Sequence, residues 1–359
     1  VQLRPLRSIA LISWNILKQY PDTNRTMRNV MFMKSRSSIY IYILIFTTIT
    51  CSCTSKDKTI LKDIESVLLK CEKHLACDSL AIPFASVNRL IGADDALYIA
   101  SNETNELLSL DWDNDNMKSH KLPIQAQSLF LQNDDVYAYS SYNPLWKYNI
   151  RNGTHSKASI PDSLFPINHL AFFVKDSAYY FFSNLSGKQE VATIMDLRTG
   201  KFNELGTLTT KYDDINYRFR SARHLLEYQD GFLSIGKFVP IIEYFDSEGN
   251  LKETFDMKTI PVVFQYLKEE YILKGRTPYF ITKDCLIKKD NLYLLVRDDE
   301  NNNTFKSIIE FSLKDSIEVK RHYLLTESKE VLNFTMKEDT FVVFDYASTQ
   351  LKFYPIAKK

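Results

Sequence analysis

One short pattern recurs six times along the chain and constrains its fold more than any other feature. Each copy is an apolar stretch, a turn that contains Asp, and a second apolar stretch, as in RLIGADDALYIA (89–100) and HLLEYQDGFLSI (224–235). The copies are roughly 40 to 60 residues apart, a spacing typical of arrays of one supersecondary unit. The six turn residues are Asp95, Asp134, Asp176, Asp230, Asp290 and Asp339.

Two columns of the aligned copies have consistent chemistry. Five residues before each Asp is an apolar column: Leu90, Leu129, Ala171, Leu225, Cys285 and Phe334. One residue earlier is a mostly polar column: Arg89, Ser128, Leu170, His224, Asp284 and Asn333. Such alternation predicts a strand with one buried face, and Asp followed by a small or polar residue is typical of hairpin turns. We therefore interpret the six aspartates as surface turn residues and not as catalytic groups.

A third strand, and usually a fourth, follows each hairpin, so each unit is expected to be a four-stranded antiparallel sheet. Six such units predict an all-β fold, a six-bladed β-propeller over residues 78–359. The last copy has only three strands and ends with QLKFYPIA (350–357). We expect SLAIPF (79–84) to be its fourth strand and to close the ring, which removes an exposed sheet edge. In the spacer 54–77, apolar residues near helical spacing predict a short helix over residues 58–73.

The first fifty-three residues have the features of a targeting segment. IYIYILIFTTIT (39–50) is too short to span a membrane and has the size of the apolar part of a signal peptide. A basic stretch that begins at Met33 precedes it, so we assign a signal peptide to residues 33–53 and regard residues 1–32 as an over-extended N-terminus. A cysteine after a small residue then resembles a bacterial lipobox. Cys53 is the expected lipidation site, Cys51 is the alternative, and two incidental thiols behind a cleaved signal are a third reading.

The signal segment, the cysteine, the short spacer and the six Asp-turn units together resemble the TolB-like six-bladed β-propeller lipoproteins of Bacteroidetes. The resemblance covers roughly residues 33–359 and depends on architecture and repeat pattern. It implies an outer-membrane lipoprotein of the bacterial cell envelope that faces either the periplasm or the cell surface. It implies no particular activity, because many members of this family have none assigned and fold alone does not determine function.

Composition and motifs exclude several classes of function. With 45 Lys and Arg against 44 Asp and Glu, the chain lacks the basic excess of a general nucleic-acid-binding protein. It has no G-x-S-x-G elbow, no H-E-x-x-H motif and no P-loop. Asp284 and Asn333 offer two oxygen ligands in the polar column, but a hard cation needs six or more. We therefore expect no metal and no cofactor.

Two long connections between units are the candidate ligand-binding loops, because long loops in compact domains are often functional. TTKYDDINYRFRSAR (209–223) and PVVFQYLKEEYILKGRTPY (261–279) both combine Tyr with Arg, which suits carboxylate, phosphate or sugar ligands. They are expected at the end of the channel where the innermost strands begin. The candidate binding residues are Arg89, His169, Arg218, Arg220, Arg223, His224, Arg276 and Tyr279.

The charge of this end of the channel has two interpretations. Convergence of Arg89, Arg223, His224 and Arg276 would form a positive mouth that concentrates anionic ligands. Alternatively, each arginine pairs with a local acid, such as Asp213, Glu227 or Asp284, and the loops simply cap the blades.

The sequence favours a non-catalytic binding or scaffolding module for a protein or glycan ligand, attached to the membrane through its lipid. The alternative is a propeller hydrolase or lyase that acts on a sugar or lactone. Carboxylates that converge with Arg or His in the channel would favour the enzyme, and Asp213 and Asp214 are the candidates for such acid and base chemistry.

Overall fold

The computed structural model of the protein describes ten stretches of the chain. The chain divides into two units, Val1–Lys58 and Thr59–Lys359, and all of the described residues belong to the second. The signal segment and both candidate lipidation cysteines therefore lie outside the described residues. The described stretches are 60–76, 87–101, 104–113, 115–140, 143–158, 172–182, 190–207, 222–268, 280–298 and 305–356.

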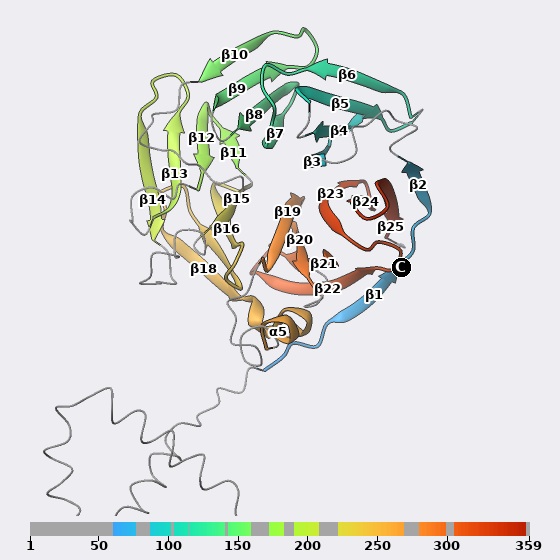
Figure 1. The fold of residues 1–359 in the computed structure, drawn as a ribbon. Coiled ribbons are helices and arrows are strands. Elements are labelled where there is room, and N and C mark those ends of the chain that lie inside the picture. Colours follow the sequence, from blue (N-terminus) through green and yellow to red (C-terminus); the bar gives the residue numbers. More distant parts are fainter. Residues whose placement is uncertain are drawn as a thin grey trace, which may run out of the picture. The chain divides into compact units, whose positions relative to one another are not determined.

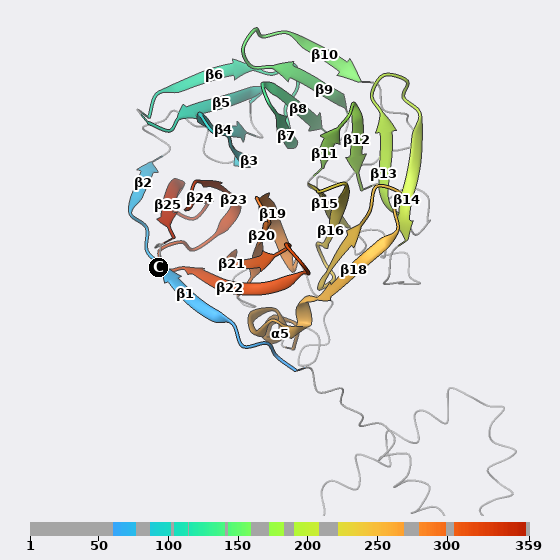
Figure 2. The ribbon, with the colours of Figure 1, turned by 180° about the vertical axis from the view of Figure 1, so that it is seen from behind.

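Six sheets surround a common axis, and each is built on a four-stranded antiparallel unit (Figures 1 and 2). This arrangement is a six-bladed β-propeller and confirms the predicted fold class. The first two blades are β3 (Val87–Gly92), β4 (Ala96–Ser101), β5 (Glu106–Asp111) and β6 (Met117–Lys121), then β7 (Ser128–Gln132), β8 (Asp135–Ser140), β9 (Asn143–Asn149) and β10 (His155–Ala158). The third and fourth are β11 (Phe173–Lys175), β12 (Ala178–Phe181), β13 (Glu190–Asp196) and β14 (Phe202–Thr207), then β15 (Arg223–Tyr228), β16 (Gly231–Gly236), β17 (Ile241–Phe245) and β18 (Leu251–Asp256). The last two are β19 (Thr282–Lys288), β20 (Asn291–Arg297), β21 (Phe305–Ser312) and β22 (Glu318–Leu325), then β23 (Val331–Lys337), β24 (Thr340–Asp345), β25 (Gln350–Pro355) and β2 (Lys73–Ala76).

An N-terminal strand closes the ring, as predicted, but it comes earlier in the chain than expected. β2 pairs antiparallel with β25 and occupies the fourth position of the sixth blade. The segment 79–84, expected to fill this position, lies outside the described residues. The closing strand was predicted too late in the chain because its position was inferred from the spacing between β6 and β7. The connection from β2 to β3 is longer than that from β6 to β7.

The helix expected over residues 58–73 is wrong, because Glu65–Leu69 forms a strand, β1. β1 adds to the fifth blade in parallel with β22, with Ser66 opposite His322 and Leu69 opposite Leu325. Leu69 is buried in the cluster between the fifth and sixth blades. Pairing with the open edge of β22 therefore overrides the helical spacing of the apolar residues.

All six turn aspartates lie in the hairpin turns between the first and second strands of their blades, as predicted. Five are exposed and Asp134 is half-buried. Such hairpins require a residue in the left-handed backbone conformation, and in most of these turns the residue before the Asp adopts it. Residues with positive φ in these turns are Asn133, Asp176, Ser177, Gln229, Lys289 and Glu338.

The core of the propeller consists of apolar clusters, each between two adjacent blades. The described members of the apolar column all pack against the preceding blade: Leu90 against the sixth, Leu129 against the first, Leu225 against the third. In the same way, Cys285 packs against the fourth blade and Phe334 packs against the fifth. Because neighbouring residues of a strand point to opposite faces, the polar column must face the following blade.

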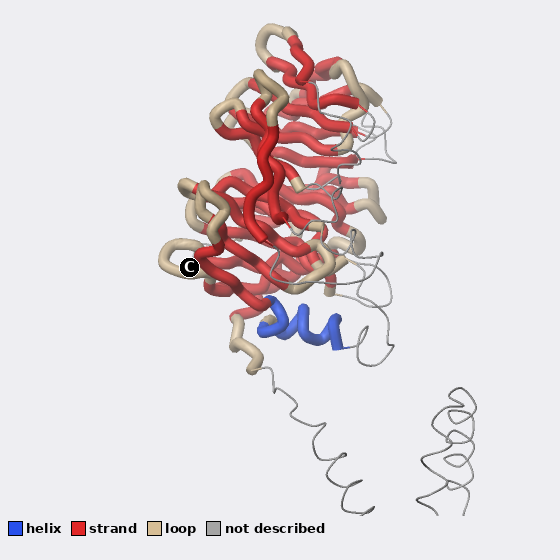
Figure 3. Tube along the Cα trace, turned by 90° about the vertical axis from the view of Figure 1, so that its left-hand side faces the viewer, coloured by secondary structure: helices blue, strands red, loops and turns tan. Residues whose placement is uncertain are grey.

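The long connection between the fourth and fifth blades begins with helical structure. The short helices are η4 (Met257–Thr259) and α5 (Pro261–Leu267), and Pro261 occupies the first turn of α5, where its missing N–H is not needed. Val263 and Tyr266 pack into the cluster between these two blades. Figure 3 shows α5 at the rim of the propeller, so the first part of this segment is structural.

Removing β1 and β2 should destabilise the propeller. A chain that starts at residue 77 loses the pairing of both strands and the buried Leu69. We expect its free energy of unfolding to be lower by about 3 kcal/mol or more than that of a chain that starts at residue 60. Urea and thermal unfolding of the two chains measure the difference. Equal stabilities would show that these strands do not close the blade edges.

Candidate functional site

Three members of the polar column link their inner strands to the next blade. The Asp284 carboxylate accepts a hydrogen bond from the backbone N–H of Phe334 at 3.1 Å. The Asn333 amide donates a hydrogen bond to the carbonyl of Val87 at 3.0 Å. The His224 ring forms a hydrogen bond with the backbone of Thr282. Inner strands present one backbone edge to the channel, and buried backbone groups need partners. These polar side chains therefore have a structural role.

An ion pair joins the first and fifth blades across the channel. The Arg89 guanidinium contacts the Asp284 carboxylate, which also accepts the backbone N–H of Cys285 at 2.9 Å. Asp284 is 1% exposed. Burial alone would lower the pKa of the Arg89 guanidinium, but the charge of Asp284, the neighbouring Cys285 and the hydrogen bond to Asp284 together outweigh burial and raise it. The Arg89 guanidinium is therefore charged at neutral pH.

Arg223 and His224 are both buried at the start of β15. Arg223 lies 3.6 Å from Glu243, to which Ser234 also donates, so this network lies within the fourth blade. Burial lowers the pKa of the His224 imidazole well below its usual range, and the charges of Lys237 and Arg89 lower it further. His224 is therefore neutral at pH 7.

The structure supports only part of the expected positive mouth. Arg89 and His224 are close enough for the charge of Arg89 to lower the pKa of His224, as their shared column predicts. Arg89 and Arg223, however, are paired with Asp284 and Glu243 and do not present uncompensated charge. The remaining candidates lie outside the described residues: His169, Arg218, Arg220, Arg276 and Tyr279, together with the acids Asp213 and Asp214.

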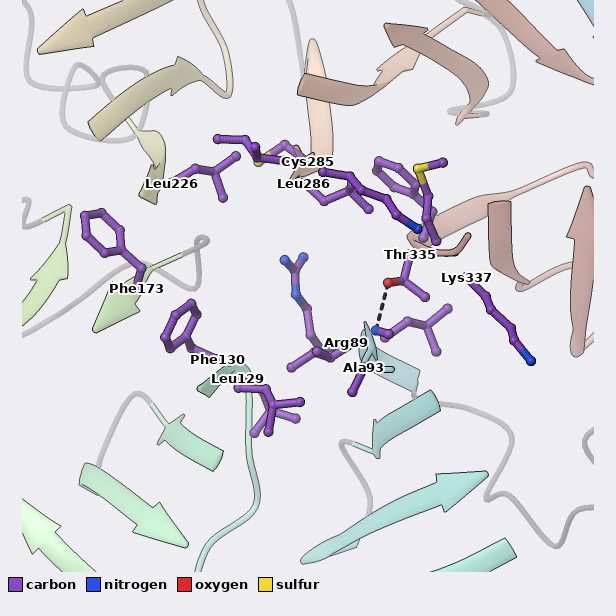
Figure 4. A pocket seen from close by; sticks show the side chains of 18 of the residues that line it. Arg89, Ala93, Leu129, Phe130, Phe173, Leu226, Cys285, Leu286, Thr335 and Lys337 are labelled. Atoms are coloured by element: carbon purple, nitrogen blue, oxygen red, sulfur yellow. Dashed lines mark hydrogen bonds between the residues drawn. The ribbon is translucent and has the colours of Figure 1, made fainter. Parts of the chain in front are cut away.

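A cavity of about 980 Å³ occupies the other end of the channel, where the inner strands reach their hairpin turns. We name it the channel cavity. Figure 4 shows Arg89 extending into the middle of a ring of side chains that includes Phe130, Phe173 and Leu226. Charged residues at the ends of the inner strands and in their hairpin turns also line the cavity: Asp94, Glu227, Lys288, Lys289, Lys337, Glu338 and Asp339.

The walls of the channel cavity were missed by sequence reasoning, although the repeat contains a signal for them. The residue after the apolar column shares the face of the polar column, so alternation predicts polar residues there. Five of the six residues that directly follow the apolar column are apolar instead. The exception, Thr335, accepts a hydrogen bond from the backbone N–H of Gly92 at 2.8 Å (Figure 4). These residues, all lining the cavity, are Ile91, Phe130, Phe172, Leu226, Leu286 and Thr335.

The described residues lack two other features that would indicate a function. They contain no group of three or more His, Cys, Asp or Glu side chains that could hold a metal ion. No helix in the described stretches has the length and apolar character needed to cross a membrane.

Comparisons with known proteins support the fold. A protein of unknown function from Bacteroides thetaiotaomicron is similar, with a TM-score of 0.52 and 11% identity over 82% of this chain and 75% of that one. Weaker likenesses are to a streptogramin B lyase (TM-score 0.48, 12% identity, 79% and 97% covered) and to the Pan2 WD40 domain of Neurospora crassa (0.49, 10%, 84% and 98%). No protein-family model and no curated protein matches the chain. At such low identity the likeness shows the propeller fold alone.

Breaking the ion pair across the channel should cost more stability than breaking an exposed one. Arg89→Met leaves the Asp284 carboxylate buried without its guanidinium, so we expect a loss of about 3 kcal/mol or more. Adding Asp284→Asn removes the charge and should recover part of the loss. Arg151→Met is the matched control, because Arg151 and Asp134 form an exposed pair at 2.9 Å worth at most about 1 kcal/mol. Similar losses in urea unfolding for Arg89→Met and Arg151→Met would contradict the assigned role.

Proposed function

We propose that the protein is a lipid-anchored, non-catalytic binding module of the bacterial cell envelope, which receives an apolar part of a protein or glycan ligand in the channel cavity. The channel cavity is the observation that carries the proposal. Its volume of about 980 Å³ lies at the upper end of the range of ligand pockets, roughly 300–1,000 Å³. Apolar walls with a charged opening suit a ligand that buries an apolar group and leaves its polar part at the rim.

The polar groups of the described channel favour binding over catalysis. The Asp284 carboxylate is held by Arg89 and by two backbone N–H groups, so it is poorly placed to exchange protons with a substrate. His224 is buried and bonded to the backbone of Thr282. A catalytic acid or base needs to be within hydrogen-bond reach of a substrate proton. These groups therefore support a fixed scaffold around the cavity.

The membrane anchor in this proposal depends on the sequence. The apolar stretch 39–50 and the cysteines that follow it precede the described residues. Lipid attachment at Cys53 would tether the propeller to the outer membrane with several acyl chains, which together anchor a protein stably.

Filling the channel cavity should weaken the binding of an apolar anion. Leu226 lines the cavity from β15, so Leu226→Trp should reduce the affinity for 1-anilinonaphthalene-8-sulfonate at least about fivefold by excluding the probe. Leu251→Trp introduces the same side chain on the outer strand β18, where Leu251 is 43% exposed, and should leave the affinity unchanged. Probe fluorescence and thermal melting of both variants are the measurements. Equal binding by the two variants would place the probe elsewhere.

The same pair of variants tests for the biological ligand. A soluble form that begins at Thr54 is screened against a glycan array and in pull-downs from cell-envelope extract. We expect a specific ligand to be retained by the wild type and by Leu251→Trp and to be lost by Leu226→Trp. Turnover of a sugar or lactone by the wild type would instead favour the enzyme.

Lipidation should depend on a single cysteine. We expect Cys53→Ala to leave the precursor unprocessed or to release the protein from the detergent-extracted fraction, because the acyl chains are missing. Metabolic labelling with a fatty-acid analogue and fractionation measure both effects, with Cys51→Ala as the control. If only Cys51→Ala loses the label, the lipobox lies two residues earlier.

A further inference from the structure

Lys237 is fixed at the junction of the fourth and fifth blades. It lies in the turn between β16 and β17, and its backbone N–H donates to the carbonyl of Ala222 at 3.0 Å. Its own carbonyl accepts the N–H groups of Ile281 at 2.8 Å and Thr282 at 3.3 Å. These bonds place the lysine beside the starts of β15 and β19, at the end of the channel opposite the channel cavity.

A second lysine lies close to the same aromatic ring as Lys237. The ammonium of Lys237 lies 4.6 Å from the centre of the Phe280 ring, and that of Lys283 lies 5.3 Å from it. The ring of Phe238 packs against Phe280 with 4.9 Å between centroids and is 5.9 Å from the Lys237 ammonium. Two cations therefore lie close to one aromatic ring, and near enough to each other for the charge of Lys283 to act on Lys237. Attraction to the rings compensates only part of the cost of removing each charge from water.

Neither lysine has an acid in ion-pair contact among the described residues. The acids that act on Lys283 from a greater distance are Asp284, which is bound by Arg89, and Glu330. Burial lowers the pKa of Lys237 to about 8, and the neighbouring charge of Lys283 contributes to this shift. Burial also lowers the pKa of Lys283. The neighbouring groups His224 and Arg89 add no negative charge, since His224 is neutral at pH 7 and Arg89 is a cation.

We propose that Lys237 and Lys283 form a binding site for an oxyanion, the carboxylate or phosphate group of a small ligand or glycan, with Phe280 and Phe238 as its apolar wall. An oxyanion between the two ammonium groups supplies the counter-charge that the described protein lacks. The aromatic wall reduces water access and strengthens the attraction. The site is independent of the channel cavity, since it involves other residues at the opposite end of the channel.

Anion binding must change the titration of Lys237 if this assignment is correct. A lysine whose pKa in the folded protein lies below its ordinary value loses its proton more easily, and a bound anion opposes this loss. Saturating glucuronate or inorganic phosphate should therefore raise the pKa of Lys237 by about one unit or more. One unit corresponds to a tenfold preference of the anion for the protonated lysine. Binding should weaken correspondingly as the pH rises above 8.

The experiment is an NMR titration of the protein with ¹³C-labelled lysine side chains, in the presence of glucuronate, phosphate or neutral glucose. Lys237→Met and Lys283→Met should each weaken anion binding at least about tenfold. Lys258→Met, which removes a half-exposed lysine from η4, should not. The two channel-end substitutions remove one of two repelling charges, so melting temperatures should not fall. Should a methionine variant fail to fold, the titration of the wild-type lysine decides alone.

Three results would overturn the proposal: a pKa of Lys237 that glucuronate and phosphate leave unchanged, an equal effect of glucose, or an equal loss of binding in Lys258→Met. A response to only one of the two anions supports the site and identifies its ligand as a carboxylate or a phosphate. Because the probes, the residues and the readout differ from those of the channel cavity, either proposal can fail without the other.

Discussion

The inner strand of every blade has one edge that its own sheet leaves uncovered, and the ring depends on how the backbone groups of these edges are satisfied. Asp284 and Asn333 each form a hydrogen bond with the inner strand of the following blade, and Thr335 accepts a hydrogen bond from the N–H of Gly92. Side chains of the same strands pack in the opposite direction, as Leu225 does against the third blade. The two faces of each inner strand thus connect it to both neighbours, which fixes the blades around the axis.

This arrangement makes the two ends of the channel chemically different. Three consecutive residues of β19 have different surroundings: Lys283 lies beside Phe280, Asp284 forms the ion pair and Cys285 lines the channel cavity. The charges of Arg89 and Asp284 neutralise each other, whereas Lys283 has no acid in ion-pair contact among the residues that the structure describes. A single strand therefore presents three environments within three residues.

The repeat predicted the fold well because each copy depends on local alternation and turn chemistry. The turn aspartates and the buried positions of Leu90 and Phe334 follow directly from it. β1 could not be predicted in this way, since its strand conformation depends on pairing with β22, far away in sequence. The candidate site was predicted only in part. Arg89 was found through its column, but its pairing with Asp284 depends on the closed ring, and Lys237 lies in a turn outside both columns.

The entry of the chain into the propeller has a mechanical consequence. Lys62 donates its backbone N–H to Thr259 of η4 at 2.9 Å, β1 then lies along β22, and β2 lies along β25. A pull on the residues before Ile60 therefore meets three attachments in series. Along β1 the force runs parallel to the strand and loads all five register pairs from Glu65 to Leu69 together, in shear. The fifth and sixth blades share the load, so tension at the N-terminus is transmitted across their interface and does not peel one sheet apart strand by strand.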